Sequence, residues 1–378
     1  MRLVLFLTVP LVFFSCNNLS NKEGNSDLKI LEYPVELDIE TLINRKAKLL
    51  SFKEIIDTIE YVPLETKDEC LIGRIRIINF NNDNIFIGQG YDIFQFSGGG
   101  NFIRKVGQQG RGPGEYMQLR DMVLINDTLY INGRHKAMLF NSKGELRNEI
   151  SIPLSIYFGK INNYYVNYNT DTGEIEFFTE TGTHYISRLY DHNHSFEPLV
   201  YMIGYWDETI FIRNGTDLFI HENYNDTVLL IKSPHDINPY YIFNMGKYKL
   251  PDEFRYNNGP EKFEELTREF FRRAIYETNN YLFIKLSRWF PTSENNDVYL
   301  CVFDKRKGEL FLVTDDNGNT NFKDFYPVAS YEDYLLFTID AYKTTEYSDK
   351  FNPGTSFEEI TNNMSENDNP LVIKMKLK

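Results

Sequence analysis

The residues with the most distinctive chemistry lie in a glycine-rich stretch at positions 107–115. Its four glycines are Gly107, Gly110, Gly112 and Gly114. Arg111 and Glu115 stand among them. No Gly-Lys-Ser/Thr sequence follows, so the stretch is not a nucleotide-binding P-loop. The planar guanidinium of an arginine suits two-pronged recognition. If the fold encloses a central channel and Arg111 points into its mouth, Arg111 could bind a carboxylate or sugar hydroxyls. The stretch is therefore a candidate ligand site.

The same stretch also has a purely structural interpretation. Glycines let a backbone turn sharply between two β-patterned segments at little steric cost. Arg111 would then pair with Glu115 or with a backbone carbonyl. The sequence leaves both interpretations open, and they differ in whether the Arg111 side chain reaches a channel.

Histidines, cysteines and serines form no complete catalytic or metal-binding set in the sequence. His192 and His194 have the spacing of a metal pair, but no further ligand is adjacent, and a protein zinc site takes three or four. No serine elbow or cysteine–histidine pair is visible. The chain is rich in acidic residues, so two carboxylates could face each other across a channel and cleave a glycosidic bond. That reaction depends on the distance between the carboxylates, which the sequence does not supply. The sequence thus identifies no metal ligands and no cofactor.

The elements that must position these residues are short β-patterned runs closed by polar or glycine turns. Three runs lie between residues 84 and 106, and a glycine triplet provides the positive φ of a tight hairpin. Moving the sequence by 44 residues places Phe96 on Phe140 and Gly100 on Gly144. A repeat of about 40–50 residues with several strands per unit is typical of a β-propeller blade.

Several segments resemble one protein family. Residues 107–116, the Tyr-Val-Pro-Leu-Glu-Thr segment at 61–66, and the segments 225–227 and 246–250 are similar to the six-bladed β-propeller lipoproteins of Bacteroidetes, relatives of the NHL and TolB-like propellers. The resemblance covers most of the chain after residue 50. It implies an all-β fold with six blades and says little about activity, because much of the family has no assigned reaction.

We expect the propeller to span residues 51–378. The expected blades are at about 72–106, 122–150, 161–200, 201–245 and 281–313, with a sixth that begins at 322–339 and is completed by strands from both ends of the chain. Residues 52–64 should pair with residues 370–377, because a propeller without exposed edges must be closed. Residues 343–369 are polar and are expected to form a long surface loop.

A helical period interrupts the β pattern at about residues 260–278. Phe263, Leu266, Phe270 and Ala274 recur at helical spacing, and Pro260 suits a first turn. This pattern predicts one inserted amphipathic helix. It would cover a blade or act as a lid over one mouth of the channel.

The amino terminus has the pattern of an export signal. Residues 1–15 contain one arginine and an apolar run too short for a comfortable membrane helix, and Cys16 follows at once. This resembles a bacterial lipobox, in which the cysteine is lipidated, although Phe13 and Phe14 depart from its commonest form. The alternative is an ordinary secretory signal. We expect lipidation at Cys16 and attachment to the cell envelope, in the outer membrane.

The next segment, residues 16–50, is expected to be a flexible tether and an amino-terminal extension. Its second half should lie against the outside of the first blade. Beyond Cys16, the two remaining cysteines are Cys70 and Cys301, which are either buried free thiols or one disulfide.

Composition limits the partners of the protein. The chain has 378 residues and a formal net charge of −14. Sequence-independent nucleic-acid binding needs a basic surface, so we expect no nucleic-acid partner. Aromatic residues make up 15% of the chain, which suits strands.

Two functions from different classes fit these observations. The first is a non-catalytic envelope lipoprotein that binds a glycan, a peptide or an envelope protein at one face of the propeller. The second is a hydrolase or lyase centred on the channel, as in NHL-like lyases and lactonases. That resemblance implies Ca²⁺ or another metal on the propeller axis, held by inward residues from several blades.

Overall fold

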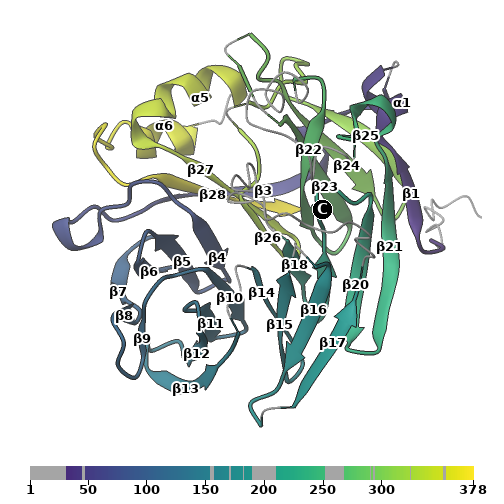
Figure 1. Ribbon diagram of the computed structural model, residues 1–378. Helices are drawn as coiled ribbons and strands as arrows, with labels where there is room; N and C mark the ends of the chain where they lie inside the picture. The colour runs from purple at the N-terminus through teal and green to yellow at the C-terminus, as the bar shows by residue number, and fades with distance from the viewer. Residues whose placement is uncertain are drawn as a thin grey trace, which may run out of the picture.

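A computed structural model describes residues 31–378 except 45–46, 154–156, 170–171, 182, 190–209, 252–267, 290, 293, 324 and 352–354. Six sheets of four or five strands stand around a common centre (Figure 1). The chain is therefore a six-bladed β-propeller, as the repeat and the family resemblance together predict.

Blades one to three each contain four antiparallel strands in sequence order. Blade one consists of β4 (Ile77–Phe80), β5 (Asn84–Gln89), β6 (Asp92–Ser97) and β7 (Phe102–Lys105). Blade two consists of β10 (Asp121–Ile125), β11 (Thr128–Asn132), β12 (Lys136–Phe140) and β13 (Leu146–Ser151). Blade three consists of β14 (Tyr157–Ile161), β15 (Tyr164–Asn169), β16 (Glu174–Phe178) and β17 (His184–Arg188).

Blades four to six each include a strand from an end of the chain. Blade four consists of β18 (Phe211–Asn214), β19 (Asp217–Ile220), β20 (Thr227–Ser233), β21 (Asp236–Asn244) and β1 (Val35–Asp38). Blade five consists of β22 (Phe271–Glu277), β23 (Tyr281–Arg288), β24 (Val298–Asp304), β25 (Glu309–Thr314) and β2 (Leu49–Ser51). Blade six consists of β26 (Ala329–Tyr331), β27 (Tyr334–Ile339), β28 (Leu371–Leu377) and β3 (Ile56–Pro63). Blades three and five thus begin earlier than we expected, at residues 157 and 271.

The 44-residue repeat has a clear structural basis. Gly100 and Gly144 both take a positive φ, of 89° and 73°, in the turn before the fourth strand of their blades. In both blades the register shifts at the residue before that turn, so that Phe96 lies opposite Phe102 and Phe140 opposite Leu146. The two blades therefore share a glycine-dependent turn and an extra residue in the fourth strand, Ile103 in β7 and Arg147 in β13, which is the signal that the repeat carries.

The ring is closed by strands from both ends of the chain, as expected. β28 pairs antiparallel with β27 on one side and with β3 on the other, and Ile373 lies opposite Tyr61. Six of the seven β28 side chains are buried. Closure therefore joins the last strand of the chain to one of the first by backbone hydrogen bonds and by core packing.

The amino-terminal extension does not lie where we expected. β1 pairs in parallel with β21 and β2 pairs in parallel with β25, so both strands extend blades four and five and not the first blade. Helix α1 (Ile39–Asn44) crosses between these blades and buries Ile39 and Leu42. A second short helix, α2 (Phe52–Ile55), leads into β3. β1, α1 and β2 therefore cover outer edges of the propeller, which sequence alone did not indicate because the partners are distant.

The expected helix at about 260–278 is wrong over its described second half. Residues 271–277 form β22, the first strand of blade five, and residues 252–267 lie outside the described part. Buried and partly buried side chains alternate along β22. Two of its buried positions are Arg273 and Glu277, which are matched by Asp226 and Lys305. The strand period was hidden because charged residues fill positions that a pattern search assigns to the surface.

The polar segment at 343–369 is also not a plain loop. It contains α5 (Thr344–Phe351) and α6 (Thr355–Thr361). Its few apolar side chains anchor it, since Phe357 is buried and packs edge to face against Tyr61 with ring centroids 5.1 Å apart. Among the described residues, the other short helices are η1 (Asp68–Cys70), η3 (Gly246–Tyr248) and η4 (Ala341–Lys343). Cys70 and Cys301 are buried free thiols, which agrees with the first of our two expectations.

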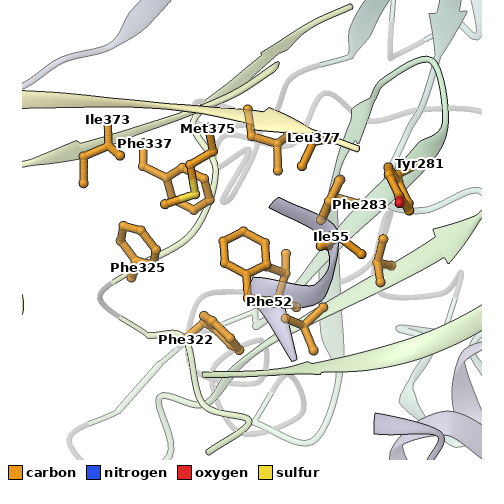
Figure 2. Packing of buried hydrophobic residues seen from close by; sticks show 14 of the residues in the cluster. Phe52, Ile55, Tyr281, Phe283, Phe322, Phe325, Phe337, Ile373, Met375 and Leu377 are labelled. Atoms are coloured by element: carbon orange, nitrogen blue, oxygen red, sulfur yellow. The ribbon is translucent and has the colours of Figure 1, made fainter. Parts of the chain in front are cut away.

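Blades five and six share one aromatic core (Figure 2). Phe52, on α2, lies between the two sheets. Its ring meets Phe283 and Phe337 edge to face, with centroids 6.3 and 5.8 Å apart. Phe337 also lies near Phe325, with nearly parallel rings 4.3 Å apart. Helix α2 therefore acts as a wedge that joins the closing blade to its neighbour.

We predict that Phe52→Leu lowers the free energy of unfolding by about 1–2 kcal/mol. The variant loses ring volume and several aromatic contacts while keeping the site apolar. Chemical denaturation monitored by circular dichroism measures the change. Lys53→Ala, on the exposed side of the same helix, is the control. An unchanged denaturation midpoint in Phe52→Leu would contradict the wedge role.

Candidate ligand site in the central channel

The first strand of every blade faces a central channel. Residues of β4, β10, β14, β18, β22 and β26 line a cavity of about 1070 Å³. Small-molecule sites commonly fall in the range of about 300–1,000 Å³. The channel is thus large enough for a ligand of several rings.

The up-and-down order of the strands in each blade decides which side chains lie at each end of this channel. In an up-and-down blade, the connection from the preceding blade and the turn between the second and third strands lie at the same end. Arg76 and Arg120 directly precede β4 and β10, and Arg134 lies in the turn between β11 and β12. We call this end the arginine end. The turns between the first and second strands lie at the opposite end.

Three arginines are neighbours at the arginine end. Burial lowers the pKa of Arg120, and the positive charges of Arg134 and Arg76 lower it further. Arg76 Nη1 donates to the carbonyl oxygen of Leu119 at 3.2 Å. Within the described residues, none of the three forms an ion pair. The buried Nε atoms of Arg120 and Arg134 also find no hydrogen-bond acceptor there. The cluster therefore repels itself and leaves donors available for an anion.

Asp121 adds a carboxyl group beside this cluster. It lines the channel and is partly buried. Its Oδ1 accepts a hydrogen bond from the Met122 amide at 2.8 Å, and its Oδ2 accepts one from the Phe158 amide at 3.2 Å. Burial raises the pKa of Asp121 to about 7, although these bonds and the charge of Arg76 act in the other direction. The carboxyl group is thus only partly ionised at neutral pH and compensates the arginines incompletely.

Exposed tyrosines flank the arginine end. Tyr342, which is 61% exposed, lines the channel. Tyr91 lies in the turn between β5 and β6, close enough to Arg120 to affect its pKa. The entrance thus combines guanidinium groups with aromatic rings.

The glycine-rich stretch forms a braced connector between blades one and two. β8 (Gln108–Gln109) and β9 (Glu115–Tyr116) pair in parallel across it. The Glu115 carboxylate accepts hydrogen bonds from Gln108 Nε2 at 2.6 Å and from the Gly112 amide at 2.8 Å. A Cβ at Gly110 would collide with this carboxylate. Hydrogen bonds lower the pKa of Glu115, so it stays ionised in this role.

The other predicted residues of this stretch have the following places. Gly107 and Gly114 take positive φ values of 65° and 71°. Arg111 is exposed and is not among the residues that line the channel. Ligand binding by Arg111 thus stays a prediction, and the structural interpretation accounts for Glu115 and the glycines.

The remaining candidates give no catalytic centre. Cys16, His192 and His194 lie outside the described residues. The described residues contain no group of three histidine, cysteine or acidic side chains that could hold a metal ion. The described channel lining includes no histidine or cysteine.

Sequence reasoning missed the arginine cluster, although one signal was present. Arg76 and Arg120 are 44 residues apart, the same spacing that relates Phe96 to Phe140. The repeat therefore places two arginines at equivalent positions before the first strands of blades one and two. Arg134 has no such counterpart, because the equivalent position holds Gly90.

Comparison with known proteins gives a family. Residues 34–376 match the family described as "Domain of unknown function (DUF4934)". The chain belongs to this family. A search among curated proteins found no match to this DUF4934 chain.

Solved structures of similar proteins agree on the fold. A protein of Bacteroides fragilis described as exported is 15% identical, with a TM-score of 0.68 over 91% of the DUF4934 chain and 99% of its own. A DUF4221 family member from Bacteroides vulgatus is 11% identical, with a TM-score of 0.52 over 85% and 97%. At these identities the likeness shows the propeller fold alone.

A more distant structure is an inactive virginiamycin B lyase from Staphylococcus aureus with quinupristin. It is 11% identical to the DUF4934 chain, with a TM-score of 0.43 over 85% of this chain and 100% of the lyase. This likeness is too weak to carry an argument about activity. Among the described residues, no helix is long and apolar enough to span a bilayer.

Proposed function

We propose that this protein is a binding module of the cell envelope that takes an anionic small molecule into the arginine end of its channel without converting it. One observation carries the proposal: Arg76 and Arg120 line one mouth of the channel, Arg134 lies near Arg120, and none of the three forms an ion pair within the described residues. The protein as a whole has a net charge of −14, so this local excess of positive charge runs against its composition.

The ligand class follows from the chemistry of the arginine end. Guanidinium groups bind carboxylate, sulfate and phosphate through paired hydrogen bonds, and such charge-assisted bonds are stronger than neutral ones. An anion would relieve the mutual repulsion of the arginines and would give the Nε atoms of Arg120 and Arg134 an acceptor. The exposed rings of Tyr91 and Tyr342 would contact an apolar or sugar portion of the ligand.

Envelope attachment belongs to the same proposal. The apolar run before Cys16 supports export and lipidation at this cysteine, in the outer membrane. The exported relative from Bacteroides fragilis fits this location. Intact mass of the native protein tests the anchor: acyl chains on a chain that begins at residue 16 are expected, and an unmodified amino terminus would contradict it.

Isothermal titration calorimetry tests the ligand class. The titrants are citrate, benzene-1,3,5-tricarboxylate and inorganic phosphate, with the methyl esters of both carboxylates as uncharged controls. We expect at least one anion to bind, its affinity to fall as salt is raised, and the esters not to bind. Failure of all three anions to bind at millimolar concentration would overturn the proposal.

One observation favours a catalytic alternative. A carboxyl group with a pKa of about 7, such as Asp121 beside the ligand-binding arginines, suits a general base in a hydrolase or lyase. Turnover of a bound anion that is lost in Asp121→Asn would favour this enzyme over a binding module. Elemental analysis after metal-replete purification tests the metal-dependent form of the alternative.

We predict that anion affinity falls by about tenfold between pH 6 and pH 8, and that Asp121→Asn removes most of this change. Because burial raises its pKa to about 7, Asp121 gains its negative charge within this interval and then opposes the ligand. Titration calorimetry at several pH values measures the effect. A flat profile for the wild-type protein, or an equal slope in Asp121→Asn, would contradict it.

The same carboxyl group affects stability with a definite sign. Its pKa is raised in the folded state, so its contribution to stability is fully present below about pH 4 and is lost as the pH rises through 7. The control is His135→Gln, which removes an imidazole next to Arg134 in the β11–β12 turn. In this control, the part of the pH dependence of the free energy of unfolding that comes from Asp121 should be unchanged.

A further inference from the structure

A second pocket lies at the end of the propeller opposite the arginines. Its volume is about 440 Å³, and it lies between blades four and five. The β18–β19, β22–β23 and β24–β25 turns form its walls, together with residues just before β1. These turns connect first to second strands or third to fourth strands, which places the pocket away from Arg120. It is therefore separate from the proposed anion site.

One wall of this pocket is an aromatic platform. The Tyr33 ring stacks on the Tyr240 ring with centroids 4.0 Å apart and an angle of 19° between the planes. Tyr33 is 43% exposed, although large apolar rings in this protein are mostly buried. Both tyrosines line the pocket. The platform comes from two chain segments about 200 residues apart, so it exists only in the folded protein.

The β18–β19 turn contributes hydrogen-bond acceptors to the pocket lining. Asn214 Nδ2 donates to Asn279 Oδ1 at 3.2 Å, which orients the Asn214 amide. The Asn214 Oδ1 atom is buried and finds no donor within the described residues. Asp217 also lines the pocket and forms neither an ion pair nor a hydrogen bond through its carboxylate among those residues. A buried acceptor without a donor is costly, so a ligand that donates hydrogen bonds would be favoured here.

The charged groups of the pocket argue against an ionic ligand. Lys305 Nζ lies 2.5 Å from Glu277 Oε1, and Tyr241 donates to the same carboxylate at 3.1 Å. Arg306 Nε lies 3.5 Å from Asp304 Oδ1. Lys305 and Arg306 are thus paired with carboxylates, and their positive charges would still repel an ammonium group on a ligand. Asp217 would repel an anion. A neutral ligand with several hydroxyl groups meets neither penalty.

We propose that this pocket binds a neutral sugar, whose ring lies on Tyr33 and whose hydroxyls donate to Asp217 and Asn214. Sugar rings have an apolar face that packs on aromatic side chains, while their hydroxyls match carboxylate and amide oxygens. The pocket has room for one or two sugar rings. It is independent of the anion site, so either site can be present without the other.

A panel of neutral oligosaccharides of glucose, galactose, mannose, xylose and N-acetylglucosamine tests the inference. Saturation-transfer NMR identifies which sugars bind, and titration calorimetry measures affinity. We expect at least one to bind, and we expect Tyr33→Ala and Asp217→Asn each to weaken it about tenfold or more. Both substituted side chains are at least partly exposed, and circular dichroism confirms the fold of each variant.

The controls separate this pocket from the channel. Tyr342→Ala removes an exposed tyrosine at the arginine end and should leave sugar binding unchanged, as should Arg120→Ala. Tyr33→Ala should in turn leave anion binding unchanged. The inference is overturned if no neutral sugar binds at millimolar concentration, or if Tyr33→Ala and Asp217→Asn both bind as the wild type does. Equal loss in Tyr342→Ala would move the sugar to the channel and also overturn it.

Discussion

The double variant Arg120→Ala/Arg134→Ala is expected to weaken anion binding about 100-fold or more. Hydrogen bonds to charged groups contribute about 1.5–3 kcal/mol each, and about 2.7 kcal/mol corresponds to a 100-fold change in affinity. Both side chains carry a buried Nε without an acceptor in the described protein, so a bound anion supplies what the fold lacks. Titration calorimetry with the tightest of the tested anions measures the loss.

The stability of this variant distinguishes a binding role from a structural one. Because Arg120 is repelled by Arg134 and Arg76, removing charge should leave the free energy of unfolding of the unliganded protein unchanged or raise it. Arg147→Ala is the matched control, since Arg147 lies on the outer strand β13 of the same blade and pairs with Glu145. Lower stability of the double variant together with wild-type anion affinity would mean that the cluster supports the fold.

Removal of the last nine residues, 370–378, is expected to abolish cooperative folding. This truncation deletes β28, whose side chains contribute to the shared core of blades five and six (Figure 2). It also leaves β27 and β3 without their common partner. The free energy lost with two unpaired strand edges and an apolar layer exceeds the stability of a typical domain, which is about 5–15 kcal/mol. Thermal unfolding followed by circular dichroism checks the prediction.

A shorter truncation provides the control. A chain ending at Leu377 lacks only Lys378, which lies outside the β28 ladder, and should unfold cooperatively near the wild-type temperature. A synthetic peptide of residues 370–378 added to the long truncation should restore part of the signal, because closure depends on the strand itself. A long truncation that melts like the full chain would show that five blades and an open sixth are sufficient.

Some of this architecture is readable from local signals in the sequence. The pairing of residues 52–64 with residues 370–377 follows from apolar strand patterns at both ends of a repeat protein that must close, and the structure adds the register, with Ile373 opposite Tyr61. The equivalence of Phe96 and Phe140 follows from a turn that needs positive φ at Gly100 and Gly144. Such features depend on neighbours within a few residues or on a strict spacing, so no coordinates are needed to find them.

Other features were misread because distant partners decide them. Arg273 and Glu277 occupy buried strand positions only because Asp226 and Lys305 lie beside them in the folded ring. Without these partners, the same residues fit a helix with a polar face. The glycine-rich surroundings of Arg111 are distinctive in the sequence and those of Arg120 are not, so the sequence analysis singled out Arg111 alone.

The sequence by itself determined that the chain forms repeated β-sheets and that both ends complete one of them, and it predicts an export signal before Cys16. These conclusions rest on periodicity, on glycine turns and on an apolar run, all of which are local. Only the tertiary structure decided that Arg76, Arg120 and Arg134 meet at one mouth of the channel, and that Tyr33 stacks on Tyr240. The physical reason is that a ring of blades brings the connectors of different sheets together at each end, and charge and aromatic contacts between them have no local signature.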